Sequence, residues 1–443
     1  MNRRMGRESG QVSIITVIIF ILLFSVLVIS FSRIMVTVSR QTTNDELAAS
    51  AKAAAESGIE DAKRILSYCM TGGVTGCAFL DKPIDDSSIT CTTISSSTGL
   101  MSALQLSPSS DSVVAVGNTG NQSYLCLKAT MITPDYLGSL SSNGNTDGLS
   151  ESEVIPLNFV DKSNPDVPVS PATIQIQWHN TGSDSDGAAT VLDGSALPTA
   201  DNWGKTVPAV LRVEFVAVPK SSFTISQLAA NVRSVTLRPS TAWGDPNSNL
   251  NNGSDSGIPA KFAASIGTAP ISGGTISYNV YNLDSWIVKG GQDANAAPNY
   301  VNPTVFLLPV QCAKDTPYTG YSCGVVFKIP KIPGSGSTDY LFDTTPTGYD
   351  YYLRLQAVYQ NTHFRVSAKD PSGKDLFFKD VQADVDVTGR ATDSQKRLNV
   401  RLNPNNGKED YQWWPDYAID SAGRVCKDMT ILNNSGTDNC KDK

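Results

Sequence analysis

The stretch that decides the fold runs from Val12 to Phe31 and reads VSIITVIIFILLFSVLVISF. These 20 positions contain no charged residue, no Gly and no Pro. As a helix that rises about 1.5 Å per residue, the stretch covers roughly the 30 Å hydrocarbon core of a bilayer. We therefore predict a transmembrane helix over residues 12–31.

The charges before the span predict its orientation. Arg3, Arg4 and Arg7 precede it, and short positively charged ends stay in the cytoplasm. A cleaved secretory signal is an alternative, but its apolar core is usually about 7–15 residues long and ends at an A-x-A-like site. This run is longer and ends in SFSRIMV. We expect a single-pass cell-membrane protein with a cytoplasmic N-terminus and all later residues outside.

The helical pattern continues past the span without a breaker and becomes amphipathic. Small and apolar residues recur at spacings of three and four, at Leu47, Ala51, Ala54, Ala55, Gly58, Ala62, Ile65 and Leu66. Charged residues occupy the other faces, at Lys52, Glu56, Glu60, Asp61, Lys63 and Arg64. The glycines of TGGVTG predict that the helix ends near Tyr68–Gly73. We expect one long helix over 11–70, with Glu56 and Glu60 paired to its own basic residues rather than to a neighbouring subunit.

Three features in this order resemble the N-terminal region of type IV pilins, and among them the PilX-like minor pilins. They are the basic leader MNRRMGRESG (1–10), the apolar start QVSIITVIIFILLFSVLVIS (11–30) and the segment AAESGIEDA (54–62). The resemblance covers about the first 70 residues. It implies that a prepilin peptidase cuts between Gly10 and Gln11, which releases leader 1–10, and that the new amino group of Gln11 is methylated.

The resemblance also implies a position in a fibre. Most major pilins carry a Glu where this chain has Ile15, whereas PilX-like and tip-located relatives often lack it. A minor subunit that primes, caps or decorates an extracellular pilus fibre is therefore implied, with other pilins, the assembly platform, the prepilin peptidase and the membrane as its partners. The helix assembly face would comprise Ile15, Leu47, Ala51, Ala55, Glu56, Gly58, Glu60, Ala62 and Leu66.

Three alternatives stay open. A plain single-pass anchor followed by a stalk explains the span and the arginines, but it explains neither the Gly10 junction nor the AAESGIEDA segment. A second junction at Gly6 would leave Arg7 and Glu8 ahead of the span. A pilin-anchored adhesin, which binds a host or partner-cell surface through its β head, is the alternative function.

The overall charge argues against a nucleic-acid-binding protein. The 443-residue chain has a formal net charge of -7. The leader carries three arginines and one glutamate, so its removal leaves -9. No Lys/Arg cluster follows downstream, and we expect no direct contact with nucleic acid.

The cysteines predict disulfides. All eight follow the span, on the side that the topology places in an oxidising environment. Many connectivities are open; pairing nearest neighbours gives Cys69–Cys77, Cys91–Cys126, Cys312–Cys323 and Cys426–Cys440. Zinc binding would need closer Cys pairs or neighbouring histidines, so we expect no metal there.

The rest of the chain predicts a β-rich head, and the fold class is α+β. We divide it into a β-rich region with long loops at 71–270 and a β-rich sheet with a polar tail at 271–443. In the first region, strands are expected at 112–116, 123–132, 173–179, 209–218 and 232–239, the last three in one sheet. In the second, alternating runs predict strands from about residue 275 to 402, with a hairpin turn at DPSGKD (370–375). The segment 384–402 also resembles, more loosely, the closing hairpin of pilin-like subunits.

No catalytic set stands out. His179 and His363 are the only histidines, and both lie in alternating strand patterns typical of half-exposed sheet residues. No G-x-S-x-G, H-E-x-x-H or phosphate-binding glycine loop occurs in a strand-to-helix context. We expect no enzyme and no cofactor.

Two loop segments are weaker candidates for binding sites. Asp184, Asp186 and Asp193 offer oxygens to Ca²⁺, although the spacing lacks the terminal Glu of an EF-hand, and an ordinary solvated loop is the favoured reading. The second candidate is an aromatic patch that would contact a sugar or a host surface, or would simply cover a sheet edge. It consists of Tyr411, Trp413, Trp414 and Tyr417.

Overall fold

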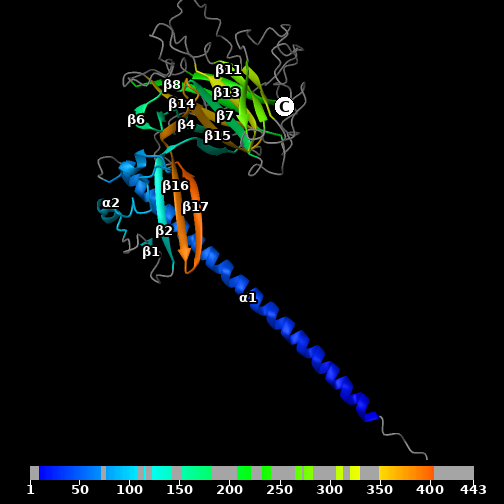
Figure 1. Cartoon of the computed structure of the whole chain (residues 1–443). Coiled ribbons are helices and arrows are strands. Elements are labelled where there is room, and N and C mark those ends of the chain that lie inside the picture. The colour runs from blue at the N-terminus through cyan, green and yellow to red at the C-terminus, as the bar shows by residue number, and fades with distance from the viewer. Residues whose placement is uncertain are drawn as a thin grey trace, which may run out of the picture. The chain divides into compact units, whose positions relative to one another are not determined.

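The architecture combines one long helix with two β-sheets (Figure 1). The structure is a computed structural model that describes residues 9–70, 76–106, 114–115, 122–141, 152–180, 207–220, 232–240, 265–271, 274–282, 306–312, 320–329 and 349–403. All of them belong to one compact unit that ends at residue 404. The fold class is α+β, as the sequence predicts.

Helix α1 extends from Ser9 to Met70 as one uninterrupted helix of 62 residues. No Pro interrupts it, and it ends within the range that the sequence predicts. Two short helical turns follow, η1 (Ala78–Asp81) and α2 (Thr98–Ala103). Their apolar side chains are buried, so this segment covers part of the core beside α1.

The larger sheet has 12 strands, and eight of them form its main path. In spatial order these are β1 (Val114–Ala115), β2 (Gln122–Thr133), β16 (Asp375–Ala391), β15 (Thr362–Lys369), β7 (Thr173–Asn180), β13 (Tyr321–Lys328), β11 (Gly274–Asn282) and β10 (Ser265–Ile271). Four more strands join at its sides: β17 (Ser394–Leu402), β3 (Tyr136–Leu140), β5 (Phe159–Asp161) and β6 (Asn164–Pro168). The predicted turn at 370–375 forms the β15–β16 hairpin, in which Lys369 pairs with Asp375.

The smaller sheet has five strands. Their order is β12 (Phe306–Gln311), β9 (Val232–Ser240), β8 (Val210–Pro219), β14 (Tyr349–Val358) and β4 (Ser152–Pro156). Its pairs are antiparallel except β12 with β9; in the larger sheet, β11 and β13 are also parallel.

One prediction about the sheets is wrong. The strands expected at 173–179, 209–218 and 232–239 do form, but β7 lies in the larger sheet while β8 and β9 lie in the smaller one. An alternating pattern identifies a strand and its buried face, and it carries no information about the partner. Strands on the two sides of residue 270 also pair directly, as β2 does with β16 and β8 with β14.

The described residues form two large hydrophobic cores. The sandwich core lies between the two sheets and contains Trp178, Phe215, Phe327 and Phe364. The Phe215 and Phe327 rings, from opposite sheets, meet edge to face with centroids 5.3 Å apart. The helix-packed core lies between the second half of α1 and the sheet formed by β1, β2, β16 and β17.

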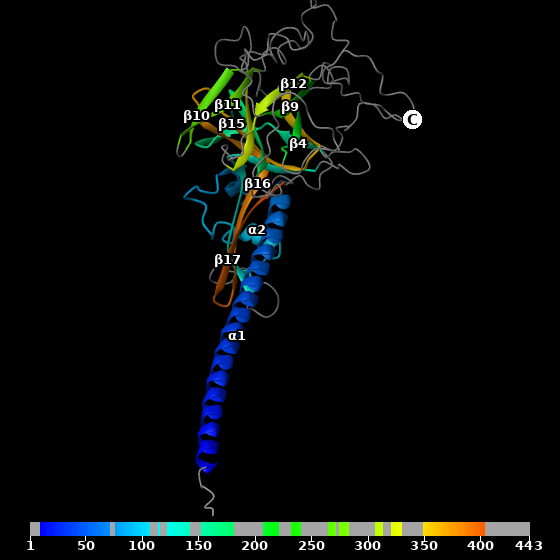
Figure 2. The same cartoon turned by 90° about the vertical axis from the view of Figure 1, so that its right-hand side faces the viewer.

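Strand β16 belongs to both cores. Its Phe378 packs in the sandwich core, whereas Val385 and Val387 pack in the helix-packed core. Figure 2 shows β16 and β17 running beside α1. Between the two parts, the register against β2 shifts between Lys379 and Asp384, and Asp380 has a φ of 60°. The bulge and the positive φ mark the point where the strand passes from one core to the other.

Candidate functional site

The first half of α1 is apolar on every face and uncovered by the described part of the chain. Every large apolar side chain from Ile15 to Val38 is more than half exposed, and Phe24 reaches 68%. The first charged residue in this segment is Arg33. A helix that is apolar all round is suited to a membrane or to a bundle of other helices. α1 is the one described helix that is long and apolar enough to span a membrane.

Several hydroxyl groups in and just after this half donate hydrogen bonds within the helix. Ser25 donates its Oγ hydrogen to the carbonyl of Ile21, and Thr37 Oγ1 donates to the carbonyl of Arg33 at 2.9 Å. Thr42 Oγ1 donates in the same way to Val38 at 3.0 Å. An apolar environment penalises unpaired polar groups, so these bonds allow the exposed half to enter lipid or a helix bundle at little cost.

The second half of α1 packs closely on the chain's own sheet. Ala51 and Ala55 are fully buried, and β16 places Gly389 directly opposite them. A Cβ on Gly389 would lie 2.1 Å from the Ala51 carbonyl oxygen and 2.4 Å from the Ala55 nitrogen. Gly58 is similarly tight, because a Cβ there would lie 2.6 Å from Val387 Cγ1. Helix and sheet therefore approach to a distance that only small residues permit.

Polar contacts fix the helix to the sheet and to the segment after it. Tyr124 on β2 donates its hydroxyl hydrogen to Asp61 Oδ2 at 2.9 Å. Burial raises the pKa of Tyr124 well above its usual range, and the neighbouring Asp61 raises it further. Arg64 pairs with Asp61 at 3.1 Å and donates to the carbonyl of Leu104 at 2.9 Å. This half of α1 is consequently part of a folded domain.

The structure divides the predicted assembly face into buried and accessible positions. The buried positions are Ala51, Ala55, Gly58, Ala62 and Leu66, and Leu47 is half-buried. Ile15, Glu56 and Glu60 are exposed. Gly10 and Gln11 lie in the first turn of α1, which begins at Ser9. The stripe predicted from the spacing thus serves the chain's own core, and the surface open to a partner is the segment before it.

Glu56 and Glu60, two exposed carboxylates of α1, pair within the helix. Glu56 lies 3.4 Å from Lys52, and Glu60 lies 2.7 Å from Lys63. Both pairs have the three- or four-residue spacing that brings side chains together on a helix surface. This is the arrangement that the sequence favours.

Three of the four expected disulfides are present among the described residues. Cys69–Cys77 joins the end of α1 to the start of η1, and Cys91–Cys126 joins the segment before α2 to β2. Cys312–Cys323 connects the end of β12 to β13, and hence the smaller sheet to the larger one. The first two bridges brace the segment that covers the helix-packed core.

Other candidates fall outside the described residues. They are the calcium candidates Asp184, Asp186 and Asp193, the aromatic patch Tyr411, Trp413, Trp414 and Tyr417, and the pair Cys426 and Cys440. Among the residues that are described, no group of three or more His, Cys, Asp or Glu side chains is placed to hold a metal ion.

The histidines differ from each other in environment. His363 on β15 is half-buried, as its strand pattern predicts. His179 is only 2% exposed, so its expected half-exposed position is wrong. Its backbone has a φ of 65°, and its N–H donates to Thr362 Oγ1 at 3.0 Å. Gln177, two residues before it, is buried as well, so both faces of the end of β7 are covered.

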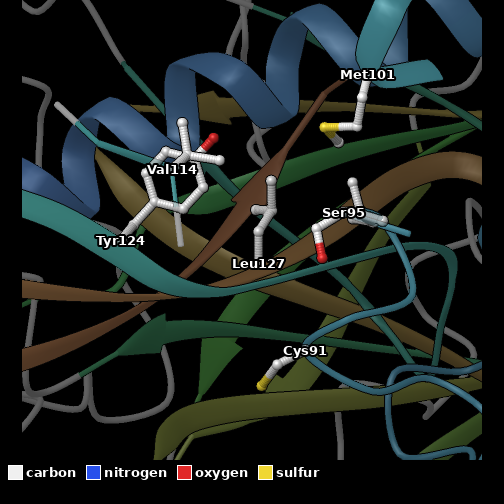
Figure 3. A pocket seen from close by; sticks show the side chains of 7 residues that line it. Cys91, Ser95, Met101, Val114, Tyr124 and Leu127 are labelled. Carbon is white, nitrogen blue, oxygen red and sulfur yellow. The ribbon is translucent and has the colours of Figure 1, made fainter. Parts of the chain in front are cut away.

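A small cavity lies beside the helix-packed core (Figure 3). Its lining includes Met101 from α2 and Tyr124 and Leu127 from β2, with Cys91 at the disulfide end. It has room for about one water molecule, far less than a ligand site needs. We regard it as a packing defect of the core.

Sequence reasoning missed the residues that set the distance between helix and sheet. Gly389 stands alone within an alternating strand pattern, and an isolated strand glycine is a signal of close backbone approach. Its contact with Ala51 required knowledge of which strand lies under α1.

Comparison of the chain with models of known families, with curated proteins and with solved structures finds no significant match.

Proposed function

We propose that this protein is a minor type IV pilin of the PilX-like kind, a structural subunit of an extracellular fibre. The observation that carries the proposal is the division of α1 into two halves. The first is exposed and apolar on all sides, and the second is packed through Ala and Gly residues on the chain's own sheet. One helix thereby offers a membrane segment before assembly and a packing surface for other subunits afterwards.

In the proposed mechanism, a prepilin peptidase cuts between Gly10 and Gln11, and the new terminus is methylated. An assembly platform then lifts the helix from the bilayer into a bundle of other pilin helices. Burial of apolar area, worth about 25 cal/mol per Å², holds the helix in lipid and in the bundle alike. The exchange is therefore possible without a large net cost.

Ile15 supports a minor position in the fibre. A carboxylate at this position would need a partner, because an unpaired charge is costly in apolar surroundings. With Ile15 the helix makes no such demand on the subunit ahead. A subunit that primes or caps the fibre has a neighbour missing on one side, which fits a helix without this requirement.

The second candidate function, a surface adhesin with a pilin-like anchor, rests on the position of the sandwich core in the chain. The segment between β2 and the second half of β16 supplies nearly all of that core. The helix-packed core is closed by α1, the segment up to β2, the end of β16 and β17. The sandwich is thus an insertion into a smaller unit, and such an insertion is suited to a separate binding role.

Processing can be tested in the membrane fraction with paired glycine variants. Wild-type protein should begin at methylated Gln11 by N-terminal sequencing and intact mass. Gly10→Val should block cleavage, while Gly6→Val, at the other candidate junction, should leave it intact. Retention of Met1 in the wild type, or cleavage after Ser30, would contradict the proposal.

Adhesion needs a test of its own. If the aromatic patch binds a surface, Trp413→Ala with Trp414→Ala should abolish cell binding while the number of pili stays the same. Unchanged binding would remove the patch from consideration.

A further inference from the structure

The two cores are joined by few crossings of the chain. At one, β2 ends at Thr133 and β3 begins at Tyr136, so Pro134 and Asp135 form the corner between them. At another, β16 passes through its bulge near Asp380. Crossings so short and irregular would allow the cores to tilt against each other unless side chains prevent it.

A set of buried and partly buried polar side chains lies at these crossings, and we call it the polar junction. Arg365 of β15 forms an ion pair with Asp135, with its Nε 2.7 Å from the carboxylate, and Arg401 of β17 donates a hydrogen bond to Asp135 at 3.4 Å. Arg401 also lies 3.5 Å from Asp384 of β16. The junction comprises Asp135, Arg365, Gln382, Asp384 and Arg401.

The side-chain amide of Gln382 on β16 forms two hydrogen bonds with the backbone of β3. Its Nε2 donates to the Leu137 carbonyl at 2.8 Å, and its Oε1 accepts from the Leu137 N–H at 3.1 Å. A β16 side chain therefore pairs with β3 as a neighbouring strand would. Gln382 is 2% exposed, so neither bond is readily replaced by water.

The junction connects groups that belong to different cores. Arg365 lies on β15, whose neighbours Phe364 and Val366 pack in the sandwich core. Arg401 lies on β17 between Val400 and Leu402, which pack against the helix-packed core. The Asp135 carboxylate binds both, and its side chain is only 10% exposed. A buried charge is tolerated only while its partners stay in place, so this geometry favours one arrangement of the two cores.

We propose that the polar junction is a latch that joins the helix-packed core and the sandwich core into one cooperative unit. With the latch closed, neither core opens without the other. A movement of α1 and the β16–β17 hairpin then moves the sandwich core with it. This inference does not depend on the proposed function of the protein.

The chain offers a matched control on the same hairpin. Arg397 on β17 forms a bidentate ion pair with Asp386 on β16, four residues from Arg401 along the strand. Both of its residues belong to the sheet of the helix-packed core, and the Arg397 side chain is 70% exposed. Its loss removes another Arg–Asp ion pair between β16 and β17 without touching the connection between the cores.

The test is hydrogen exchange by mass spectrometry on the full-length chain in detergent, with wild type, Arg401→Gln and Arg397→Gln. In the wild type and in Arg397→Gln, the slowest amides of the two cores should exchange at equal rates once each rate is divided by its intrinsic rate, as in one cooperative unit. In Arg401→Gln the rates should separate by about tenfold or more, because the buried Asp135 carboxylate keeps Arg365 but loses its link to β17.

Asp135→Asn, which keeps the size of the side chain, serves as the second variant where Arg401→Gln does not fold, and it should show the same separation. Equal rates in the folded latch variant would overturn the proposal. An equal separation in Arg397→Gln would overturn it as well, since any ion pair of the hairpin would then have the same effect.

Discussion

The two cores of this protein are built from different residues for different tasks. The helix-packed core brings a helix onto a sheet through Ala51, Ala55, Gly58 and Gly389. The sandwich core is filled by aromatic and β-branched side chains from two facing sheets, and its Trp178 is fully buried. The contact of α1 with β16 depends on the absence of side-chain volume, whereas the sandwich core depends on its presence.

This difference shows how each core gains stability. In the sandwich, large rings remove much apolar surface from water, and Trp178 Nε1 also donates to the Ala209 carbonyl at 2.9 Å. The helix-packed core also buries apolar side chains, and it gains further from close contact between backbones and from two disulfides that hold the covering segment. The stability of the sandwich core should be sensitive to truncated side chains, and that of the helix-packed core to added side-chain volume.

Truncation of the sandwich core should have the largest effect. Trp178→Ala is expected to lower the free energy of unfolding by about 3–5 kcal/mol, because it removes a buried ring and leaves a cavity. Trp178→Phe keeps most of the apolar volume and loses the bond to Ala209, at a cost of about 1 kcal/mol. Denaturant unfolding of both variants measures the difference. A loss below about 1 kcal/mol for Trp178→Ala would contradict this prediction.

Added volume in the helix-packed core should have a smaller but clear effect. Gly389→Ala is expected to cost about 2–3 kcal/mol, because the obstacle is the α1 backbone and the helix must move away. Gly373→Ala, in the β15–β16 turn, is the control; it has a φ of 86° and open space around it, so only backbone strain of about 1 kcal/mol applies. Similar losses in the two variants, measured by the same unfolding assay, would contradict the close-approach interpretation.

The smallest effect on stability is expected at the surface ion pair between Asp161 and Lys374, which lies outside both cores. A hydrogen bond from Lys374, together with bonds from Ser163, lowers the pKa of Asp161 from 3.8 to about 2. The pKa of Asp161 is lower in the folded chain than in the unfolded chain. The ionised carboxylate therefore stabilises the fold above pH 3.8, and this contribution is lost as the pH falls toward about 2. Solvent screening limits it to a few tenths of a kcal/mol. Asp161→Asn should be slightly less stable than wild type at pH 6 and equal to it near pH 2.

Thermal unfolding midpoints across this pH range provide the measurement for Asp161. Asp166→Asn is the control, since Asp166 is highly exposed and lies 3.8 Å from Lys379. A difference in unfolding midpoint between Asp161→Asn and wild type that grows as the pH falls would contradict the prediction.

The helix and most strands were predictable from the sequence because their signals are local. The apolar run, the spacing of small residues from Ala51 to Leu66 and the turn at 370–375 each depend on residues close together in the chain. The three nearest-neighbour disulfides among the described residues also followed from proximity along the chain.

The arrangement of strands and the polar junction were not predictable. The alternation in β7 and β8 is similar, yet facing sheets and neighbouring strands produce the same pattern. Strands β3 and β5 are short and lie in segments that read as loops. Asp135 and Arg401 are far apart in sequence, and each on its own looks like a solvated charge. Their contact depends on β16, whose length and bulge bring the two cores together.

The central claim is that α1 leaves the membrane to become part of a fibre. Intact-mass analysis of the chain recovered from sheared surface fibres tests it most directly. The account predicts a chain that begins at methylated Gln11 and co-purifies with other pilins. Recovery of the chain only from the membrane fraction, with residues 1–10 still attached, would contradict it.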